Sequence, residues 1–259
     1  MQTYRHTAAG LLFFATLLAP GAASADRVGV ASAVVNQVEG VSGGNRQSLA
    51  VGSAIFENEH IRTGDASTAQ LLFLDKTSLS LGPHAEVVLD RFLYDPKRRG
   101  HVVINATQGA LRFITGSMNP TSYTIKTPVA TLGIRGTILD LLMSGDPING
   151  YTLTVILVEG SAIITLPNGQ VLNLTQPGTA FVIGSNGQVQ GPVQWDGTIV
   201  SVGGNVSFPL YGWYFQGEPP PNGLPPTQIG SIDQLNAIIA EQLKIITHAP
   251  PTDNGRRGR

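Results

Sequence analysis

Turn-forming residues recur about every ten residues between Val28 and Trp195, and this spacing limits the folds open to the chain. Between the turns lie short runs of Val, Ile, Leu, Thr and Tyr, which are residue types that favour β-strands. Evenly spaced short strands are typical of β-sandwiches, barrels and β-solenoids. The sequence therefore predicts an all-β domain over residues 26–195, with no convincing helix before residue 230.

Three Asn-Gly dipeptides mark predicted hairpins, at Asn149–Gly150, Asn168–Gly169 and Asn186–Gly187. Asn-Gly favours a type I′ turn, because both residues tolerate the positive φ that this turn requires. The predicted pairs are Thr137–Met143 with Tyr151–Val158, Ser161–Leu166 with Val171–Leu174, and Ala180–Ile183 with Gln188–Gln194. Earlier in the chain, Ala69–Leu74 and Glu86–Phe92 are also predicted strands.

Several predicted strands are apolar on both faces, for example Val155–Val158 and, apart from Asp140, Ile138–Leu142. Such strands are covered on both sides, so the sheets must stack or coil closely. We expect a stacked β-sandwich or a short β-solenoid of many short strands. The turn spacing is the same for both, so this choice stays open.

Residues 1–25 have the three parts of a secretory signal peptide. Arg5 and His6 precede an apolar run over residues 8–18, and Ala23-Ser24-Ala25 forms a cleavage site. The apolar run is shorter than the about 20 residues that a membrane span needs. We expect a mature chain that starts near Asp26, without a stable membrane span, in the periplasm or outside the cell. An uncleaved signal that serves as an anchor is the alternative.

The C-terminal region differs in composition from the β domain. Residues 196–230 are rich in Gly and Pro, which predicts a linker. Residues 231–247 open with an S-x-x-Q capping box and continue with spaced apolar residues, which predicts one amphipathic helix. This helix either packs on the β domain or docks on another protein. Residues 248–259 form a basic tail that we expect to be disordered.

Composition excludes several classes of function. The chain has no cysteine, which excludes disulfides, thiolate metal sites and a lipid-modified N-terminal cysteine. The formal net charge is −1, whereas nucleic-acid binders have a strong basic bias. The histidines lack the spacing of zinc ligands. We therefore expect no nucleic-acid partner, no metal and no cofactor.

Three segments in order resemble the FecR domain family. The first runs from Thr63-Gly64-Asp65 to Gly82-Pro83 and contains Lys76 where the family often has Gly, and the second is Gly109-Ala110-Leu111-Arg112-Phe113. The third, Tyr123 to Leu139, resembles the signature V-x-T-P-x-A-x-x-x-x-R-G-T-x-F, with Ile125 for Val and Leu139 for Phe. The resemblance covers roughly residues 45 to 183 and implies a periplasmic sensing or interaction domain.

Well-known members of this family relay a signal from an outer-membrane receptor to a cytoplasmic sigma factor. The sequence shows no cytoplasmic N-terminal segment and no internal membrane helix, so we expect a freestanding exported domain. The expected function is a non-catalytic binding or signalling module whose partner is an envelope protein or polymer. The alternative is a structural or adhesive surface component.

Two motifs bear on the site. Gly40-Val41-Ser42-Gly43-Gly44 matches the G-x-S-x-G elbow of hydrolases, but no predicted helix follows it, so we expect a β-turn and no enzyme. Arg135 and Thr137 of the FecR-like signature are the candidate binding residues. The Arg135 guanidinium must be paired or reach solvent, and Asp140 is one possible structural partner.

Overall fold

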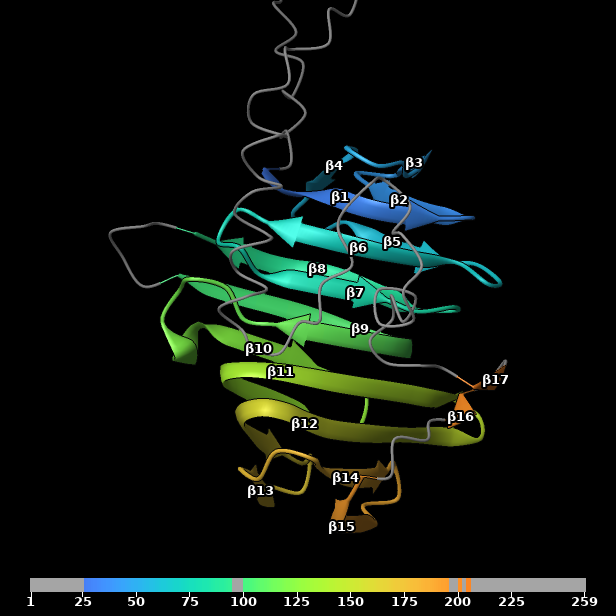
Figure 1. Ribbon diagram of the computed structural model, residues 1–259. Coiled ribbons are helices and arrows are strands. Elements are labelled where there is room, and N and C mark those ends of the chain that lie inside the picture. Colours follow the sequence, from blue (N-terminus) through green and yellow to red (C-terminus); the bar gives the residue numbers. More distant parts are fainter. Residues whose placement is uncertain (1–25, 95–99, 196–199, 202–203, 206–259) are drawn as a thin grey trace, which may run out of the picture.

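The computed structural model describes residues 26–94, 100–195, 200–201 and 204–205. Strands β1–β15 are hydrogen-bonded into one branched sheet (Figure 1), and β16 (Val200–Ser201) and β17 (Gly204–Asn205) form a separate pair. The helical content of these residues is one 3-10 turn, η1 (Pro120–Ser122). The prediction of an all-β fold is confirmed, and within the same ranges no helix is long and apolar enough to cross a membrane.

The predicted signal peptide, most of the predicted linker, the predicted helix 231–247 and the tail 248–259 lie outside the described residues.

The strand pairings divide the sheet into two layers. Layer A contains, in spatial order, β4 (Ala54–Phe56), β1 (Arg27–Val35), β6 (Thr68–Phe73), β7 (Ser78–Leu81), the C-terminal half of β9 (His101–Ile114), the C-terminal half of β11 (Thr131–Asp146), the N-terminal half of β12 (Gly150–Thr165), β14 (Thr179–Gly184) and β15 (Val189–Gln194). Layer B contains β3 (Asn45–Ser48), β2 (Val38–Ser42), β5 (His60–Thr63), β8 (Glu86–Leu93), the N-terminal half of β9, β10 (Tyr123–Lys126), the N-terminal half of β11, the C-terminal half of β12 and β13 (Val171–Leu174).

The hydrophobic core lies between the two layers. Alternate residues of each strand enter it, as the two-residue period of a β-strand requires. Two aromatic pairs join the layers: Phe73 stacks on Phe92 with ring centroids 5.3 Å apart, and Phe113 meets Tyr123 edge to face at 5.7 Å. The arrangement is that of a two-layered sandwich whose layers share three strands.

Those three long strands, β9, β11 and β12, pass from one layer to the other at glycines. Gly109, Gly136 and Gly160 have positive φ values of 90°, 54° and 84°. The register between β11 and β12 shifts at Gly136. A positive φ inside a strand is typical of a β-bulge, which bends the strand sharply. These glycines therefore let one strand serve both layers.

The predicted hairpins are confirmed, since β11 pairs with β12, β12 with β13 and β14 with β15. The type I′ geometry is wrong, because only the glycine of each Asn-Gly dipeptide has positive φ. In the first hairpin the loop is longer than two residues, and the Asp146 carboxylate accepts hydrogen bonds from the backbone N–H groups of Ile148 and Asn149. A side-chain cap of this kind favours a type I turn followed by a left-handed glycine.

Candidate functional site

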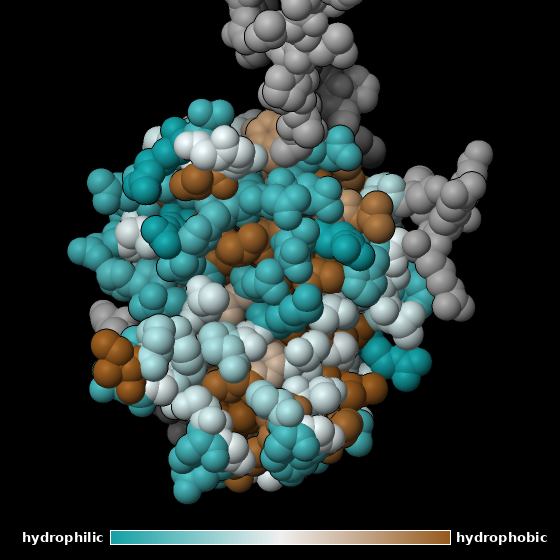
Figure 2. Space-filling model, turned by 180° about the vertical axis from the view of Figure 1, so that it is seen from behind, coloured by the Kyte–Doolittle hydropathy of each residue, from teal (hydrophilic) through white to brown (hydrophobic). Residues whose placement is uncertain are grey.

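The outer face of layer B carries charged side chains from six strands and is called here the polar face. Its charged members are Glu39, Arg46, His60, Arg62, Glu86, Asp90, Lys126 and Arg135. Figure 2, which views the molecule from behind, shows hydrophilic side chains predominating over the upper part of the molecule, where Figure 1 places β2, β3, β5 and β8. The polar face is therefore a broad, accessible and charged surface.

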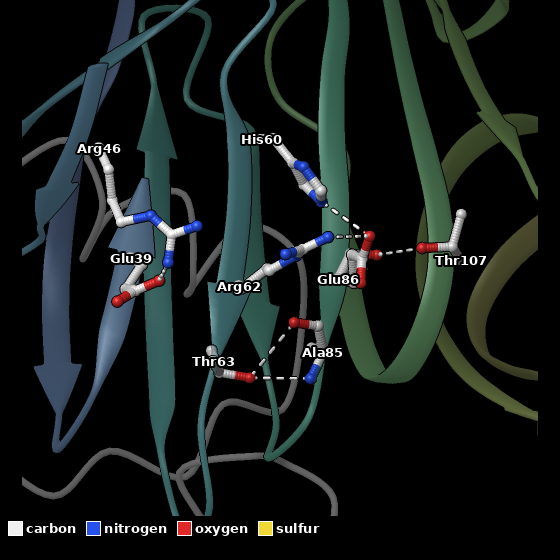
Figure 3. Close-up of polar contacts among 8 residues, drawn as sticks. All are labelled: Glu39, Arg46, His60, Arg62, Thr63, Ala85, Glu86 and Thr107. Atoms are coloured by element: carbon white, nitrogen blue, oxygen red, sulfur yellow. Dashed lines mark hydrogen bonds and ion pairs between the residues drawn. The ribbon is translucent and has the colours of Figure 1, made fainter. Parts of the chain in front are cut away.

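Glu86 is the centre of a small charge cluster on the polar face. The pairing of β5 with β8 sets Arg62 opposite Glu86, and Arg62 Nη2 lies 3.1 Å from Glu86 Oε1. His60, two residues earlier on β5, places Nε2 2.8 Å from the same oxygen (Figure 3). This second contact is an ion pair only when the imidazole is protonated. Both basic groups thus converge on one carboxylate.

Two further ion pairs extend the cluster along the polar face. Arg46 on β3 lies 2.9 Å from Glu39 on β2 (Figure 3), and Lys126 on β10 lies 3.5 Å from Asp90 on β8. Each of these side chains is more than two-fifths exposed. Exposed ion pairs add at most about 1 kcal/mol to stability, so their charges can exchange partners at little cost. The arrangement suits recognition of a charged protein surface.

Arg135 lies at the edge of the polar face, on the N-terminal half of β11. It pairs in register with Ser161 of β12, and its side chain is exposed. Its suggested structural partner, Asp140, instead accepts two hydrogen bonds of 2.6 Å from Arg112. The reason is the bend at Gly136, which transfers β11 to layer A before Asp140, so the two residues lie on opposite sides of the molecule. A solvent-facing Arg135 is compatible with its predicted binding role.

Thr137, the other predicted binding residue, is fully buried. Its hydroxyl donates to the Ser161 carbonyl at 2.9 Å and accepts from the Ser161 backbone N–H at 2.8 Å. Its own backbone N–H donates to the Thr115 hydroxyl at 2.9 Å. These contacts hold β9, β11 and β12 together at the bend. The structure therefore separates the two residues, with Arg135 on the surface and Thr137 in the interior.

The Thr-Pro part of the signature borders a shallow groove of about 270 Å³ at one end of the sandwich. Pro128 and Val129 form one wall, and the Asn168 and Asn186 turns form the other. Thr127 shapes this loop, because its hydroxyl accepts the Ala130 backbone N–H at 3.0 Å and donates to the Ala130 carbonyl at 2.9 Å. The groove has few charged groups in reach, so it offers shape without strong electrostatic recognition.

Asp75 anchors the turn between β6 and β7 inside the molecule. Its carboxylate accepts hydrogen bonds from the Thr77 backbone N–H, the Thr77 hydroxyl and the Tyr123 hydroxyl, at 3.0, 2.7 and 2.8 Å. Burial raises the pKa of Asp75, and these donors oppose the shift. The next residue, Lys76, has a φ of 71°, which explains why Gly is common there in the resembled family.

Within the described ranges, neither the hydrolase motif at Ser42 nor the histidines form a catalytic or metal site. Ser42 ends β2, and the turn at Gly43 and Gly44 leads into β3, so the G-x-S-x-G sequence forms a β-hairpin instead of the strand-to-helix turn of hydrolases. No group of three His, Asp or Glu side chains in these ranges is placed to hold a metal ion. His84 lies 3.2 Å from the exposed Asp65 and belongs to a surface turn.

The Glu86 cluster was not predicted from the sequence. Its members Arg62 on β5 and Glu86 on β8 are 24 residues apart and meet only through long-range strand pairing. Residues 86–92 do not alternate between polar and apolar residues, so no local pattern marks Glu86 as outward-facing.

Comparison with known proteins gives a family and a distant structural likeness. No curated protein matches the chain. Two crystal structures of a proposed anti-sigma factor from Parabacteroides distasonis are similar, with TM-scores of 0.41, identities of 16% and 15%, and coverage of 51% of this chain. This chain covers 57% of theirs, a little over half of their length. The family model described as FecR protein matches residues 59–163, which extend from β5 through most of β12, in agreement with the resemblance seen in the sequence.

Proposed function

We propose that this chain is an exported, non-catalytic signalling module of the bacterial envelope that binds a protein partner through the polar face. One observation carries this proposal: the region that matches the FecR model contains the Glu86 cluster, Lys126 and Arg135, all on one accessible face. Arg62, Lys126 and Arg135 are exposed, and His60 and Glu86 are partly exposed. Ion pairs at such positions are weak, which suits a surface that recognises another protein by charge.

Export is supported by the signal-like residues 1–25. Fractionation of cells that produce the full chain tests it. We expect the chain in the periplasm or the medium, with an N-terminus near Asp26 by mass spectrometry. Full-length chain in the cytoplasm would contradict export.

Site-specific photo-crosslinking in living cells tests the partner. A benzoyl-phenylalanine placed at Arg62 or Arg135 should form one discrete adduct with another protein. Ile148, which is 92% exposed at a hairpin tip away from the polar face, is the control position and should give no such adduct. Adding Arg62→Glu to the chain labelled at Arg135 should reduce the adduct yield, because a charged interface loses affinity when one charge is reversed.

The structural or adhesive alternative predicts a different result from the same experiment. Adducts only with a second copy or with a polymer, or equal adducts at Arg135 and Ile148, would contradict recognition of a protein partner by the polar face.

A further inference from the structure

The outer face of layer A differs from the polar face, because many side chains in its central part point away from the core and are nevertheless buried. It is called here the covered face. Val158 of this face is 38% exposed, whereas five of its large apolar side chains are each no more than 6% exposed and lie outside the core cluster: Leu72, Ile114, Ile138, Leu142 and Ile156. Side chains on the open side of a sheet keep this little contact with water only when something lies over them.

Polar side chains of the covered face are also buried, along one line of residues that are paired across neighbouring strands. Strand register aligns Ser80, Arg112, Asp140, Ile156 and Ala180 across β7, β9, β11, β12 and β14. Asp140 is 3% exposed, and its bidentate pair with Arg112 is therefore largely removed from water. By contrast, Thr131 and Arg135 on the outer face of layer B are exposed. The central part of layer A is therefore shielded from water where these positions of layer B are not.

The chain itself leads onto the covered face at the end of the β domain. Trp195, which follows β15, packs against Ala110, Leu142, Ile156 and Ala180 of this face. The next described residues, β16, contact β11 again. The chain continues for 64 residues beyond Trp195, from 196 to 259, and these include the predicted amphipathic helix 231–247.

We propose that the C-terminal segment, residues 206–259, docks on the covered face of its own chain through the apolar side of helix 231–247. A helix of 17 residues is about 26 Å long, close to the about 30 Å of the nine-residue stretch Ile138–Asp146 of β11. Its apolar residues are the matching surface: Leu235, Ile238, Ile239, Leu243 and Ile246. The docking joins two apolar surfaces and leaves the polar face open.

The lack of cysteine allows a direct test with the full chain from Asp26 onward. Ser80→Cys reports on the covered face, and Thr131→Cys reports on the exposed outer face of layer B. We expect a maleimide to label the Ser80→Cys chain at least about tenfold more slowly than the Thr131→Cys chain. Labelling at residue 80 requires the C-terminal segment to leave the covered face. Adding Leu235→Asp and Ile239→Asp should remove most of this protection. Adding Ala237→Asp and Ala240→Asp, on the other side of the helix, should retain it.

Equal labelling of the two cysteines, or protection that survives Leu235→Asp and Ile239→Asp, would overturn the proposal. So would protection that rises with protein concentration, because a second copy would then be the cover. A photo-crosslinker at Ile239 of the otherwise unchanged chain gives a second test that does not depend on the aspartates being tolerated. We expect its adducts on β7, β9, β11 or β12 of the same chain, and adducts on β8 or β10 would overturn the docking.

Discussion

The buried Thr137 hydroxyl connects β11 to β12 next to the bend at which the strands pass from one layer to the other. It makes two hydrogen bonds with the Ser161 backbone, while the Thr137 N–H reaches the Thr115 hydroxyl on β9. Gly136, just before it, has the positive φ that bends β11. The threonine that follows the Arg-Gly pair of the signature therefore has a structural role, because it connects the strands at the bend.

Thr137→Val should lower the free energy of unfolding by about 1–3 kcal/mol, because it removes the hydroxyl that bonds the partly buried Ser161 N–H and carbonyl. Thr137→Ser keeps the hydroxyl and should lower the free energy of unfolding by less than Thr137→Val does. Urea denaturation of both variants measures the difference. Equal losses would show that the hydroxyl contributes little.

The Arg112–Asp140 pair is the other residue-scale feature with a large expected effect. Arg112→Ala leaves the buried Asp140 carboxylate without its charged partner and should cost about 3–5 kcal/mol. Replacing both residues, by Arg112→Met with Asp140→Leu, removes the charge and the need for a partner, so it should cost much less. Denaturation at pH 7 compares the two. A double variant as unstable as Arg112→Ala would contradict this account.

At the scale of elements, the bends in β9, β11 and β12 make two layers from one set of strands. Near the β11–β12 crossing, Gly160 has a φ of 84°, and a Cβ there would overlap the Gly136 carbonyl oxygen. Gly133, three residues before the bend in β11, has no positive φ, and the nearest atom to an added Cβ is 3.9 Å away. Gly133 on β11 therefore has room for a side chain, whereas Gly160 on β12 does not.

Gly160→Ala should therefore lower the free energy of unfolding by more than about 2 kcal/mol, from backbone strain and steric overlap together. Gly133→Ala is the matched control and should change it by about 0.5 kcal/mol or less. Thermal unfolding followed by circular dichroism distinguishes them. Similar melting temperatures for the two variants would mean that the crossing at Gly160 does not require glycine.

Element-scale features were predicted where local chemistry decides them. The hairpin at Asn168–Gly169 needs only a few neighbouring residues, so its strands were placed correctly. The pairing of β9 with β7, β8, β10 and β11 depends on contacts between distant segments, and nothing in the residues of β9 names its partners. The pairing of Arg112 with Asp140, 28 residues apart, was missed for the same reason.

At the scale of the whole molecule, buried carboxyl groups make stability depend on pH. Burial raises the pKa of Asp75 and of Asp140 above 3.8 and that of Glu59 above 4.5. In the unfolded chain these groups ionise near those ordinary values, whereas in the folded chain they keep their protons to higher pH. Their contribution is therefore fully present below the ordinary values and is lost as pH rises through the folded pKa values.

The contribution of these groups to the free energy of unfolding should accordingly fall between about pH 4 and pH 7. Asp75→Asn removes one of these carboxyl groups and should make the fall in the free energy of unfolding smaller. Urea denaturation of the unchanged chain and of the variant at both pH values measures the two differences. An unchanged pH dependence in the variant would exclude Asp75 as a contributor.

The sequence by itself determined the all-β class, the hairpin partners and the FecR resemblance, because strand period, turn residues and signature spacing are all local properties. Only the tertiary structure decided how the strands divide into two layers and which face is covered. It also separated Arg135 from Thr137, although they are two residues apart, because one bend at Gly136 turns the chain from the surface into the interior. Long-range pairing sets these features, since each depends on which distant strands supply the missing hydrogen bonds and the cover.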